Sequence, residues 1–421
     1  MKRSRRGSFR ALPLVMLILL APGSLSGCGT TVSGDAVAAE IDIRSLDIGS
    51  FAIEPLDYRA TYSHRFDNGA TLAIMRLADS VANGWEIDPG LKYSRHAKPL
   101  TESSQIGDVL ADVDVPIVER EHMLFGFAMS ATSTGPAAKD YTLQHDVNSK
   151  DDQPQPDTIA LNLTVLQFPD ADAAGRAAAD VEAADFAVAA DANSAVVIDG
   201  FPKARAHWRP GVPTLGATMA RGSYLVNVFV KRPDADLGKL KELTGKALAT
   251  EIPLLDALPP LSKREVAHLD YDPQAMLRRA LHPEDLIWPS FTKEFVFTPR
   301  GFMHLVADSE TWRHSVEVGG IDLMAGAPNG GLVMRARDSA AAAALLREIK
   351  DRIQHPADSP VGVPDAYCSE TAAANLSRAD ERFYCTVRYG RYLGRVHSAQ
   401  LQDARQRAAA QFALLVNSSW M

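Results

Sequence analysis

The alternation of apolar and polar positions predicts the same arrangement of a strand and a helix at two places in the chain. Residues 159–167 alternate apolar and polar side chains, as a half-buried strand does. Asp170 then caps an alanine-rich helix that we expect to end near Phe186. Residues 331–337 repeat this order, with a short apolar strand followed by Asp338 as the helix cap.

A second pair of segments shows the same kind of repetition. Residues 224–230 are expected to form a strand, and the helix that follows places Leu237 and Leu248 on one face. The counterparts are residues 383–396 and a helix that begins near Leu401. Both pairs are offset by about 170 residues. The sequence therefore predicts an α+β fold of two similar domains made by internal duplication, with antiparallel sheets and helices packed on one face.

Prolines set the expected domain boundaries. Residues 254–264 contain Pro259 and Pro260, and paired prolines stop a helix and favour an extended connector. We expect an N-terminal α+β domain over residues 42–253, a linker over residues 254–264 and a C-terminal α+β domain over residues 265–421. Because the connector has few apolar residues around it, we also expect little packing between the halves, so that residues 265–421 fold alone.

The N-terminus has the layout of a secretory leader. Five basic residues precede an apolar run over residues 11–22, which is shorter than the roughly 20 residues that a membrane span needs. The run Leu-Ser-Gly at residues 25–27 stands directly before Cys28 and matches a lipobox, whose cysteine takes a diacylglycerol and becomes the new N-terminus. We predict a signal peptide over residues 1–27 and a lipidated flexible tether over residues 28–41. The alternative is an ordinary leader cut elsewhere.

Charge limits the class of partner. The chain has 44 Lys and Arg against 52 Asp and Glu, a formal net charge of −8 that loss of the leader lowers to −13. This is the wrong sign for a nucleic-acid surface, so we expect no nucleic-acid partner. We expect the mature chain at the extracytoplasmic face of the cell membrane, held there by its lipid.

The two cysteines of the C-terminal half predict a disulfide. Cys368 and Cys385 belong to a chain that is expected to leave the cytosol, where such a pair is normally oxidised. Cys385 lies in an alternating segment and should sit on a strand, whereas Cys368 is expected in a loop after Pro364. The alternative is a metal or redox pair, although no Cys-x-x-Cys motif is present.

Three segments resemble an uncharacterised family of two-domain actinobacterial cell-envelope lipoproteins. They are Trp-Glu-Ile-Asp-Pro at residues 85–89, Tyr-Asp-Pro-Gln-Ala-Met-Leu at residues 271–277 and Tyr-Cys-Thr-Val-Arg-Tyr-Gly-Arg-Tyr at residues 384–392, together with the lipobox. The resemblance covers most of the mature chain and implies location and architecture. It supplies no catalytic residues.

The sequence matches known catalytic and metal-binding motifs only in part. Ser290 and Lys293 fit a Ser-x-x-Lys pattern, but a strand-like segment follows them and the downstream elements of penicillin-interacting enzymes are missing. Asp308, Glu310 and His314 could hold a divalent ion, and a solvated loop explains them equally well. We assign no catalytic, cofactor or metal residues.

Two further segments have alternative explanations. His207, Trp208 and Arg209 could form a binding edge, or Trp208 could simply be packed between two exposed neighbours. The glycines of residues 326–331 are better explained by a hairpin turn than by a phosphate loop, because a strand and no Lys-Ser/Thr pair follows them.

Two function classes remain. The first is a non-enzymatic lipoprotein that binds a lipid, a cell-wall component or an envelope protein. The second is a cell-envelope hydrolase whose site is assembled from residues distant in sequence, since catalytic constellations are recognised by geometry. A nucleophile within hydrogen-bond reach of a base would favour the second class.

Overall fold

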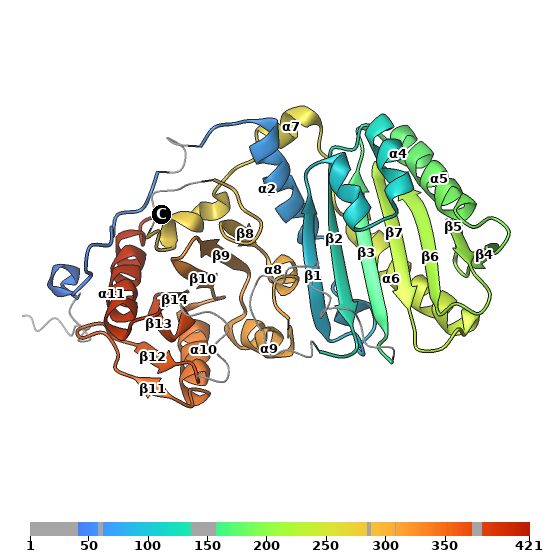
Figure 1. Ribbon diagram of the computed structural model, residues 1–421. Coiled ribbons are helices and arrows are strands. Elements are labelled where there is room, and N and C mark those ends of the chain that lie inside the picture. The colour runs from blue at the N-terminus through green and yellow to red at the C-terminus, as the bar shows by residue number, and fades with distance from the viewer. Residues whose placement is uncertain (1–40, 58–61, 136–156, 284–287, 308, 373–380) are drawn as a thin grey trace, which may run out of the picture. The chain divides into compact units, whose positions relative to one another are not determined.

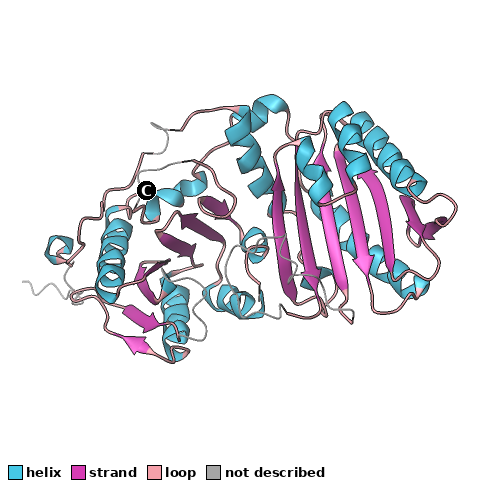
Figure 2. Ribbon diagram, viewed as in Figure 1, coloured by secondary structure: helices cyan, strands magenta, loops and turns pink. Residues whose placement is uncertain are grey.

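The computed structural model describes residues 41–57, 62–135, 157–283, 288–307, 309–372 and 381–421. Ile43–Met421 forms one compact unit. It contains two antiparallel seven-stranded sheets with helices packed on them (Figures 1 and 2). The predicted lipidation site, Cys28, lies outside the described residues.

The first sheet is built from the N-terminal half and has the strand order β1-β2-β3-β7-β6-β5-β4. Every neighbouring pair is antiparallel. Its strands are β1 (Tyr93–Leu100), β2 (Phe125–Thr132), β3 (Ala160–Gln167), β4 (Ser194–Ile198), β5 (Phe201–Trp208), β6 (Thr214–Arg221) and β7 (Tyr224–Lys231).

The second sheet repeats this topology in the C-terminal half. Its order from the other edge is β8-β9-β10-β14-β13-β12-β11, which matches the first sheet strand for strand. Its strands are β8 (Phe295–Phe297), β9 (Leu323–Ala327), β10 (Gly331–Arg335), β11 (Pro356–Ala357), β12 (Ala366–Glu370), β13 (Phe383–Tyr389) and β14 (Tyr392–Ser398). The two similar α+β domains predicted from the repeated pattern are therefore present.

The helices follow the same repeat. A helix comes after the third strand of each sheet, as α5 (Ala171–Ala187) and α10 (Ser339–Asp351), and another after the seventh, as α6 (Leu237–Asp256) and α11 (Leu401–Asn417). The others are α2 (Phe66–Ala78), α3 (Gly84–Ile87), α4 (Val115–Arg120), α7 (Lys263–Ala267), α8 (Pro299–Met303) and α9 (Ser309–Gly319). Among the described residues, no helix is long and apolar enough to cross a membrane.

Equivalent aspartates begin the two helices that follow the third strands. Asp170 accepts a hydrogen bond from the backbone N–H of Ala173 at 2.8 Å, and Asp338 accepts one from Ala341 at 2.7 Å. A side-chain oxygen at this position satisfies a backbone donor that the first helical turn leaves free. The caps expected at Asp170 and Asp338 are confirmed.

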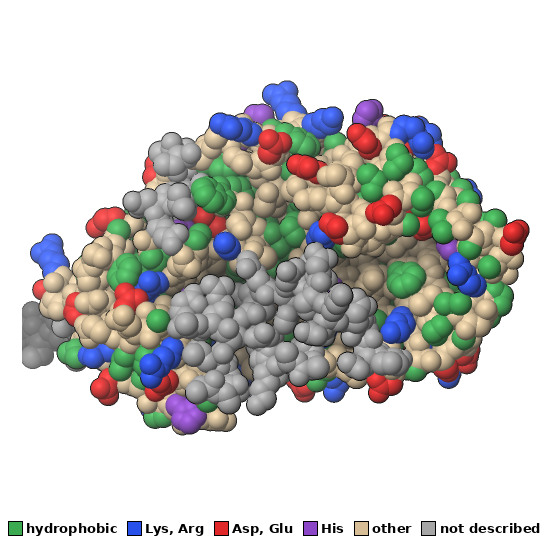
Figure 3. Space-filling model, in the orientation of Figure 1, with side chains coloured by type: hydrophobic (Ala, Val, Ile, Leu, Met, Phe, Trp, Pro, Cys, Tyr) green, Lys and Arg blue, Asp and Glu red, His purple; other side chains and the backbone are tan. Residues whose placement is uncertain are grey.

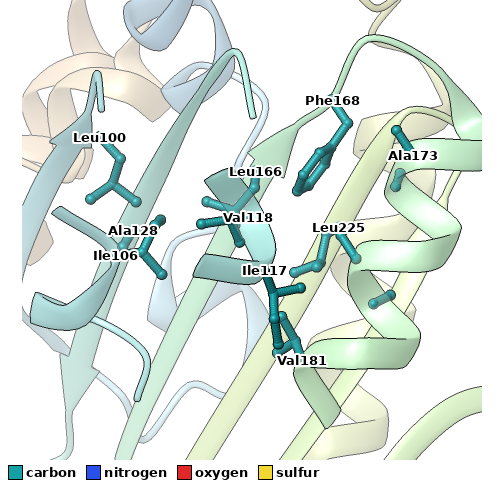
Figure 4. Close-up of a cluster of buried hydrophobic side chains, with 13 residues drawn as sticks. Leu100, Ile106, Ile117, Val118, Ala128, Leu166, Phe168, Ala173, Val181 and Leu225 are labelled. Atoms are coloured by element: carbon teal, nitrogen blue, oxygen red, sulfur yellow. The ribbon is translucent and has the colours of Figure 1, made fainter. Parts of the chain in front are cut away.

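The two faces of the first sheet differ. Helices α4 and α5 lie over one face and α6 over the other (Figure 1). A cluster of buried side chains from β1, β2, β3 and β7 packs under α4 and α5, including Leu100, Leu166 and Leu225 (Figure 4). On the opposite face of β7, Val226, Val228 and Val230 are each 0% exposed, so that face is core along its whole length.

The expectation of little packing between the halves is wrong. The carboxylate of Asp79, just after α2, accepts hydrogen bonds from the backbone N–H of Thr298 at 2.9 Å and from its hydroxyl at 2.8 Å. The Arg300 guanidinium donates to Glu86 at 3.0 Å. His304 is buried, with its Nε2 3.1 Å from the carbonyl oxygen of Val81. The contacts lie in one compact unit and join residues that the proline-based boundary assigns to different domains.

The connector is shorter than expected. Helix α6 continues to Asp256 with Pro253 inside it, and α7 begins at Lys263. Within the predicted linker of residues 254–264, only residues 257–262 lie outside these helices. The division of the chain into residues 42–253 and 265–421 remains a prediction.

Candidate functional site

The register of the first sheet places a row of side chains across the face that carries α4 and α5. Residues directly opposite each other in antiparallel strands point to the same side of the sheet. Phe229 of β7 lies opposite Asn162 of β3 and Gly216 of β6, and Gly216 lies opposite His207 of β5. The row continues through Ser130 of β2 to His96 of β1, and to Ala195 of β4.

Two further rows flank this one on the same side of the sheet. We call the three rows together the polar face. The second row is Lys98, Ala128, Thr164, Asn227, Thr218 and Arg205, and the third is Tyr93, Thr132, Ala160, Lys231 and Thr214. Beyond the second row lie the apolar side chains under α4 and α5, and Ala128 of the second row belongs to the same buried cluster.

The polar face carries positive charge. Lys98, Arg205 and Lys231 belong to its rows together with His96 and His207, and none of its strand residues is Asp or Glu. The whole chain has more acidic than basic residues. Strands of an acidic protein thus concentrate cations on one side of a sheet, and this arrangement suits an anionic ligand.

Exposed groups lie beside buried, hydrogen-bonded ones on this face. Phe229 is 43% exposed, and Asn162 and Arg205 are exposed as well. Thr218 is buried, and its hydroxyl accepts a hydrogen bond from Asn227 Nδ2 at 2.8 Å. The space-filling view shows the surface hollowed over this sheet (Figure 3). An apolar ring therefore stands among polar groups that have partners, an arrangement unlike an apolar core.

Acidic groups of neighbouring elements pair with Lys98 and His207 of the polar face. Lys98 pairs with Asp108, which ends a short 3-10 helix, Ser103–Asp108. His207 Nδ1 lies 2.7 Å from Glu182 Oε1 on α5. This hydrogen bond raises the pKa of His207, so the ring becomes cationic more readily than an ordinary histidine.

The structure separates the three residues of the expected binding edge. Trp208 is half-buried, and its indole N–H donates to the carbonyl oxygen of Val212 at 2.8 Å, so its own loop holds it. Arg209 is exposed. His207 joins the polar face, where its direct neighbours in the rows are Gly216 and Ala195. Neither neighbour is a nucleophile, so the pair of His207 and Glu182 has a base and an orienting carboxylate without a reacting group opposite it.

The equivalent positions of the second sheet are filled by aromatic rings. By strand order, β13 and β14 correspond to β6 and β7, and Tyr384 pairs with His397 where Gly216 pairs with Phe229. The Arg395 guanidinium lies 4.3 Å from the centre of the Tyr384 ring. A guanidinium of the second sheet thus stacks on a ring at this position, whereas Gly216 carries no side chain in the first sheet.

The other expected site residues are not brought together. Ser290 and Lys293 lie in a turn closed by a bridge between Ser290 and Glu294, and no helix starts at the serine. His314 lies on α9 with its Nε2 3.3 Å from Glu348, while Asp308 is outside the described residues. No cluster of three or more His, Cys, Asp or Glu in the described part of the chain could hold a metal ion.

The expected hairpin turn is present between β9 and β10. The backbone N–H of Gly330 donates to the carbonyl oxygen of Ala327 at 3.1 Å, and Asn329 has φ of 51°. Asparagine tolerates this left-handed conformation better than most residues. The segment is therefore a turn between paired strands, as predicted.

Cys368 and Cys385 form a disulfide in the structure. They lie directly opposite each other in β12 and β13. The expected loop position of Cys368 is wrong, because the residue belongs to Ala366–Glu370, a strand between β11 and β13. The bond therefore joins two neighbouring strands near the edge of the second sheet.

Sequence reasoning missed the polar face as a unit. Asn227, Phe229 and Lys231 alternate with buried valines in β7, and this alternation was visible in the sequence. The alternation shows that one side of a single strand is polar. Only the pairing register shows that the polar sides of neighbouring strands form one continuous face.

Comparisons with known proteins identify a family and a distant similarity to solved structures. No curated protein matches the chain. The crystal structure of the extracellular domain of PknH from Mycobacterium tuberculosis is similar at 11% identity and a TM-score of 0.29, covering 49% of this chain and 100% of that one. The N-terminal part of domain of unknown function DUF7373 matches residues 60–271, and its C-terminal part matches residues 276–418. The chain therefore belongs to the two-domain DUF7373 family.

Proposed function

We propose that this chain is an actinobacterial lipoprotein, anchored through Cys28 at the extracytoplasmic face of the cell membrane, and that its polar face binds an anionic polymer of the cell envelope. The leader and the Leu-Ser-Gly-Cys sequence support the anchor. The observation that carries the binding proposal is the set of cations on the polar face, in a chain of formal net charge −8.

The dimensions of the sheet favour an extended ligand. Neighbouring strands are about 4.8 Å apart, so seven strands give a face roughly 29 Å wide. Lys98 of β1 and Arg205 of β5 are near opposite ends of one row, and Lys231 belongs to the row on the other side of Phe229. A polymer with repeated anionic groups can meet several of these cations at once, and Phe229 offers an apolar ring between them.

The chemistry of the polar face favours a charged polymer over a lipid or a protein partner. A lipid chain requires an apolar cavity, whereas the rows around Phe229 carry hydroxyl, amide and charged groups. A tight protein interface usually centres on a cluster of aromatic and aliphatic anchors. Phe229 stands here beside Asn162 and Gly216.

Binding to a charged polymer and to its neutral counterpart tests the proposal. We would measure binding of dextran sulfate and of unmodified dextran to the purified full chain by biolayer interferometry. We expect dextran sulfate alone to bind, with affinity falling as salt rises, because cations of the protein replace counterions of the polymer. Affinity should also rise as pH falls through the raised pKa of His207, and His207→Gln should remove that dependence.

The variant Arg205→Gln with Lys231→Gln should weaken binding about tenfold or more, which corresponds to about 1.4 kcal/mol. The matched control is Lys239→Gln with Lys241→Gln, which removes two cations from α6 on the opposite side of the sheet. Equal losses in the two double variants, or equal binding of the neutral polymer, would show that the polar face is not the site.

A further inference from the structure

A second surface feature lies around Trp85, in one of the segments that resemble the lipoprotein family. Asn83 and Glu86 form a capping box around α3, and the backbone N–H of Asn83 donates to Glu86 Oε2 at 2.8 Å. A Cβ atom at Gly84 would lie 2.2 Å from the Cβ of Ala131 on β2. The glycine therefore lets the helix sit directly on the sheet, which fixes the position of Trp85.

Hydrogen bonds connect α3 and the loop before β1 with Arg300 and the start of α9. Arg300 donates to Glu86, and its carbonyl oxygen accepts from Asn83 Nδ2 at 3.2 Å. Close by, the Ser309 hydroxyl at the start of α9 donates to the carbonyl oxygen of Lys92 at 3.3 Å. The loop before β1 and the first turn of α9 are thus fixed to each other. A ligand that binds between them would therefore not have to pay the entropy cost of ordering these segments.

Between these elements lies a pocket of about 180 Å³. It is lined by Trp85, Pro89, Lys92, Ser309, Glu310 and Arg313. Pockets for drug-sized ligands are roughly 300 to 1,000 Å³, so this one suits a smaller molecule or the end of a longer one.

The lining presents both signs of charge next to an apolar wall. The Arg313 guanidinium lies 4.0 Å from the centre of the Trp85 ring. This stacking fixes the plane of the guanidinium, whose N–H groups can still donate hydrogen bonds in that plane. Lys92 adds a second cation and Glu310 a carboxylate. Pro89 and the indole of Trp85 supply apolar surface.

We infer that this pocket binds the carboxylate and ammonium groups of an α-amino acid or a short peptide. The carboxylate binds to Arg313 and Lys92, because a guanidinium matches a carboxylate with two parallel hydrogen bonds. The ammonium binds to Glu310, and a small side chain packs against Trp85 and Pro89. This site is separate from the polar face and does not depend on the polymer-binding proposal.

Calorimetry with matched small ligands tests the inference on the full chain. The probes are L-alanine, L-alanyl-L-alanine, L-alaninamide without a carboxylate and N-acetyl-L-alanine without an ammonium. We expect alanine, the dipeptide or both to bind, and each blocked analogue to bind about tenfold more weakly or worse. Comparison of alanine with the dipeptide decides between a free amino acid and a peptide. No millimolar binding of either, or equal binding of the blocked analogues, would overturn the inference.

Variants of exposed lining residues connect the binding to the pocket. Lys92→Gln and Arg313→Gln should each weaken alanine or dipeptide binding about tenfold, whereas Glu310→Gln should abolish the preference for an ammonium over an N-acetyl group. The control is Arg337→Gln, which removes a cation that is 68% exposed and paired with Asp338. Since Arg313 also packs on Trp85, thermal unfolding of each variant is compared with wild type. Unchanged affinity in Lys92→Gln and unchanged preference in Glu310→Gln would place the ligand elsewhere.

Discussion

Replacing Glu251 by glutamine should make the protein more stable at high pH. Glu251 lies on α6 and is 0% exposed. One carboxylate oxygen accepts a hydrogen bond from the backbone N–H of Ala82 at 2.8 Å, and the other has no partner among the residues that the structure describes. Burial raises its pKa from 4.5 to about 8. The side chain is therefore largely protonated in the folded state at neutral pH, and glutamine resembles that protonated form in shape.

The sign of the effect follows from proton linkage. The folded chain holds the Glu251 proton more tightly than the unfolded chain, so its contribution to stability is fully present below pH 4.5 and is lost as pH rises through about 8. One pKa unit corresponds to about 1.4 kcal/mol, so the rise from 4.5 to about 8 gives a loss of roughly 5 kcal/mol at most. Glutamine cannot ionise and does not suffer this loss.

Urea unfolding at a series of pH values measures the difference between variant and wild type. We expect the unfolding free energy of Glu251→Gln, relative to wild type, to rise by roughly 3 to 5 kcal/mol from about pH 5 to about pH 9. The difference is needed because burial also raises the pKa of Asp79 to about 7 and lowers that of His304 to about 4. The control Glu242→Gln, on the same helix and 64% exposed, should stay within about 0.5 kcal/mol. Parallel pH curves for Glu251→Gln and wild type would refute the reasoning.

Three further predictions concern the disulfide bond, the lipid anchor at Cys28 and the polar face. Replacing Cys368 and Cys385 by serine should lower the unfolding free energy by roughly 2 to 4 kcal/mol, and an unchanged melting profile would contradict this. Cys28→Ala should release the protein from the membrane fraction, whereas an unchanged mature mass and membrane location would argue against lipidation. Gly216→Tyr should reduce dextran sulfate binding with little change in melting temperature, because a Cβ atom there meets Phe229 only at 3.9 Å. Wild-type polymer binding in this variant would place the ligand off the polar face.

The sequence predicted the repeated elements because their signals are local. Asp170 and Asp338 cap their helices through backbone groups three residues away, and short apolar strands precede them. A common offset of about 170 residues was enough to predict two similar domains. These features depend on neighbours along the chain, so periodicity and capping residues specify them without a structure.

The contacts between the halves could not be predicted in the same way. Asp79 and Thr298 are far apart in sequence, and neither residue lies in a motif that indicates a partner. The proline-rich connector suggested that the two halves fold independently. Prolines restrict only the local backbone, however, and do not indicate how the segments on either side of them pack. Cys368 was misplaced for a related reason, because a short strand between β11 and β13 depends on pairing with its neighbours.

The polar face shows how one topology came to offer different surfaces in its two copies. In both sheets a helix follows the third strand, and the sixth and seventh strands pair beside it. Tyr384 occupies the position of Gly216 in the second sheet, and its ring lies under Arg395. In the second sheet the ring at this position stacks with a guanidinium, whereas glycine in the first sheet leaves Phe229 43% exposed. The binding capacity we propose therefore depends on side chains at equivalent positions of a shared fold, which is why the fold alone does not specify it.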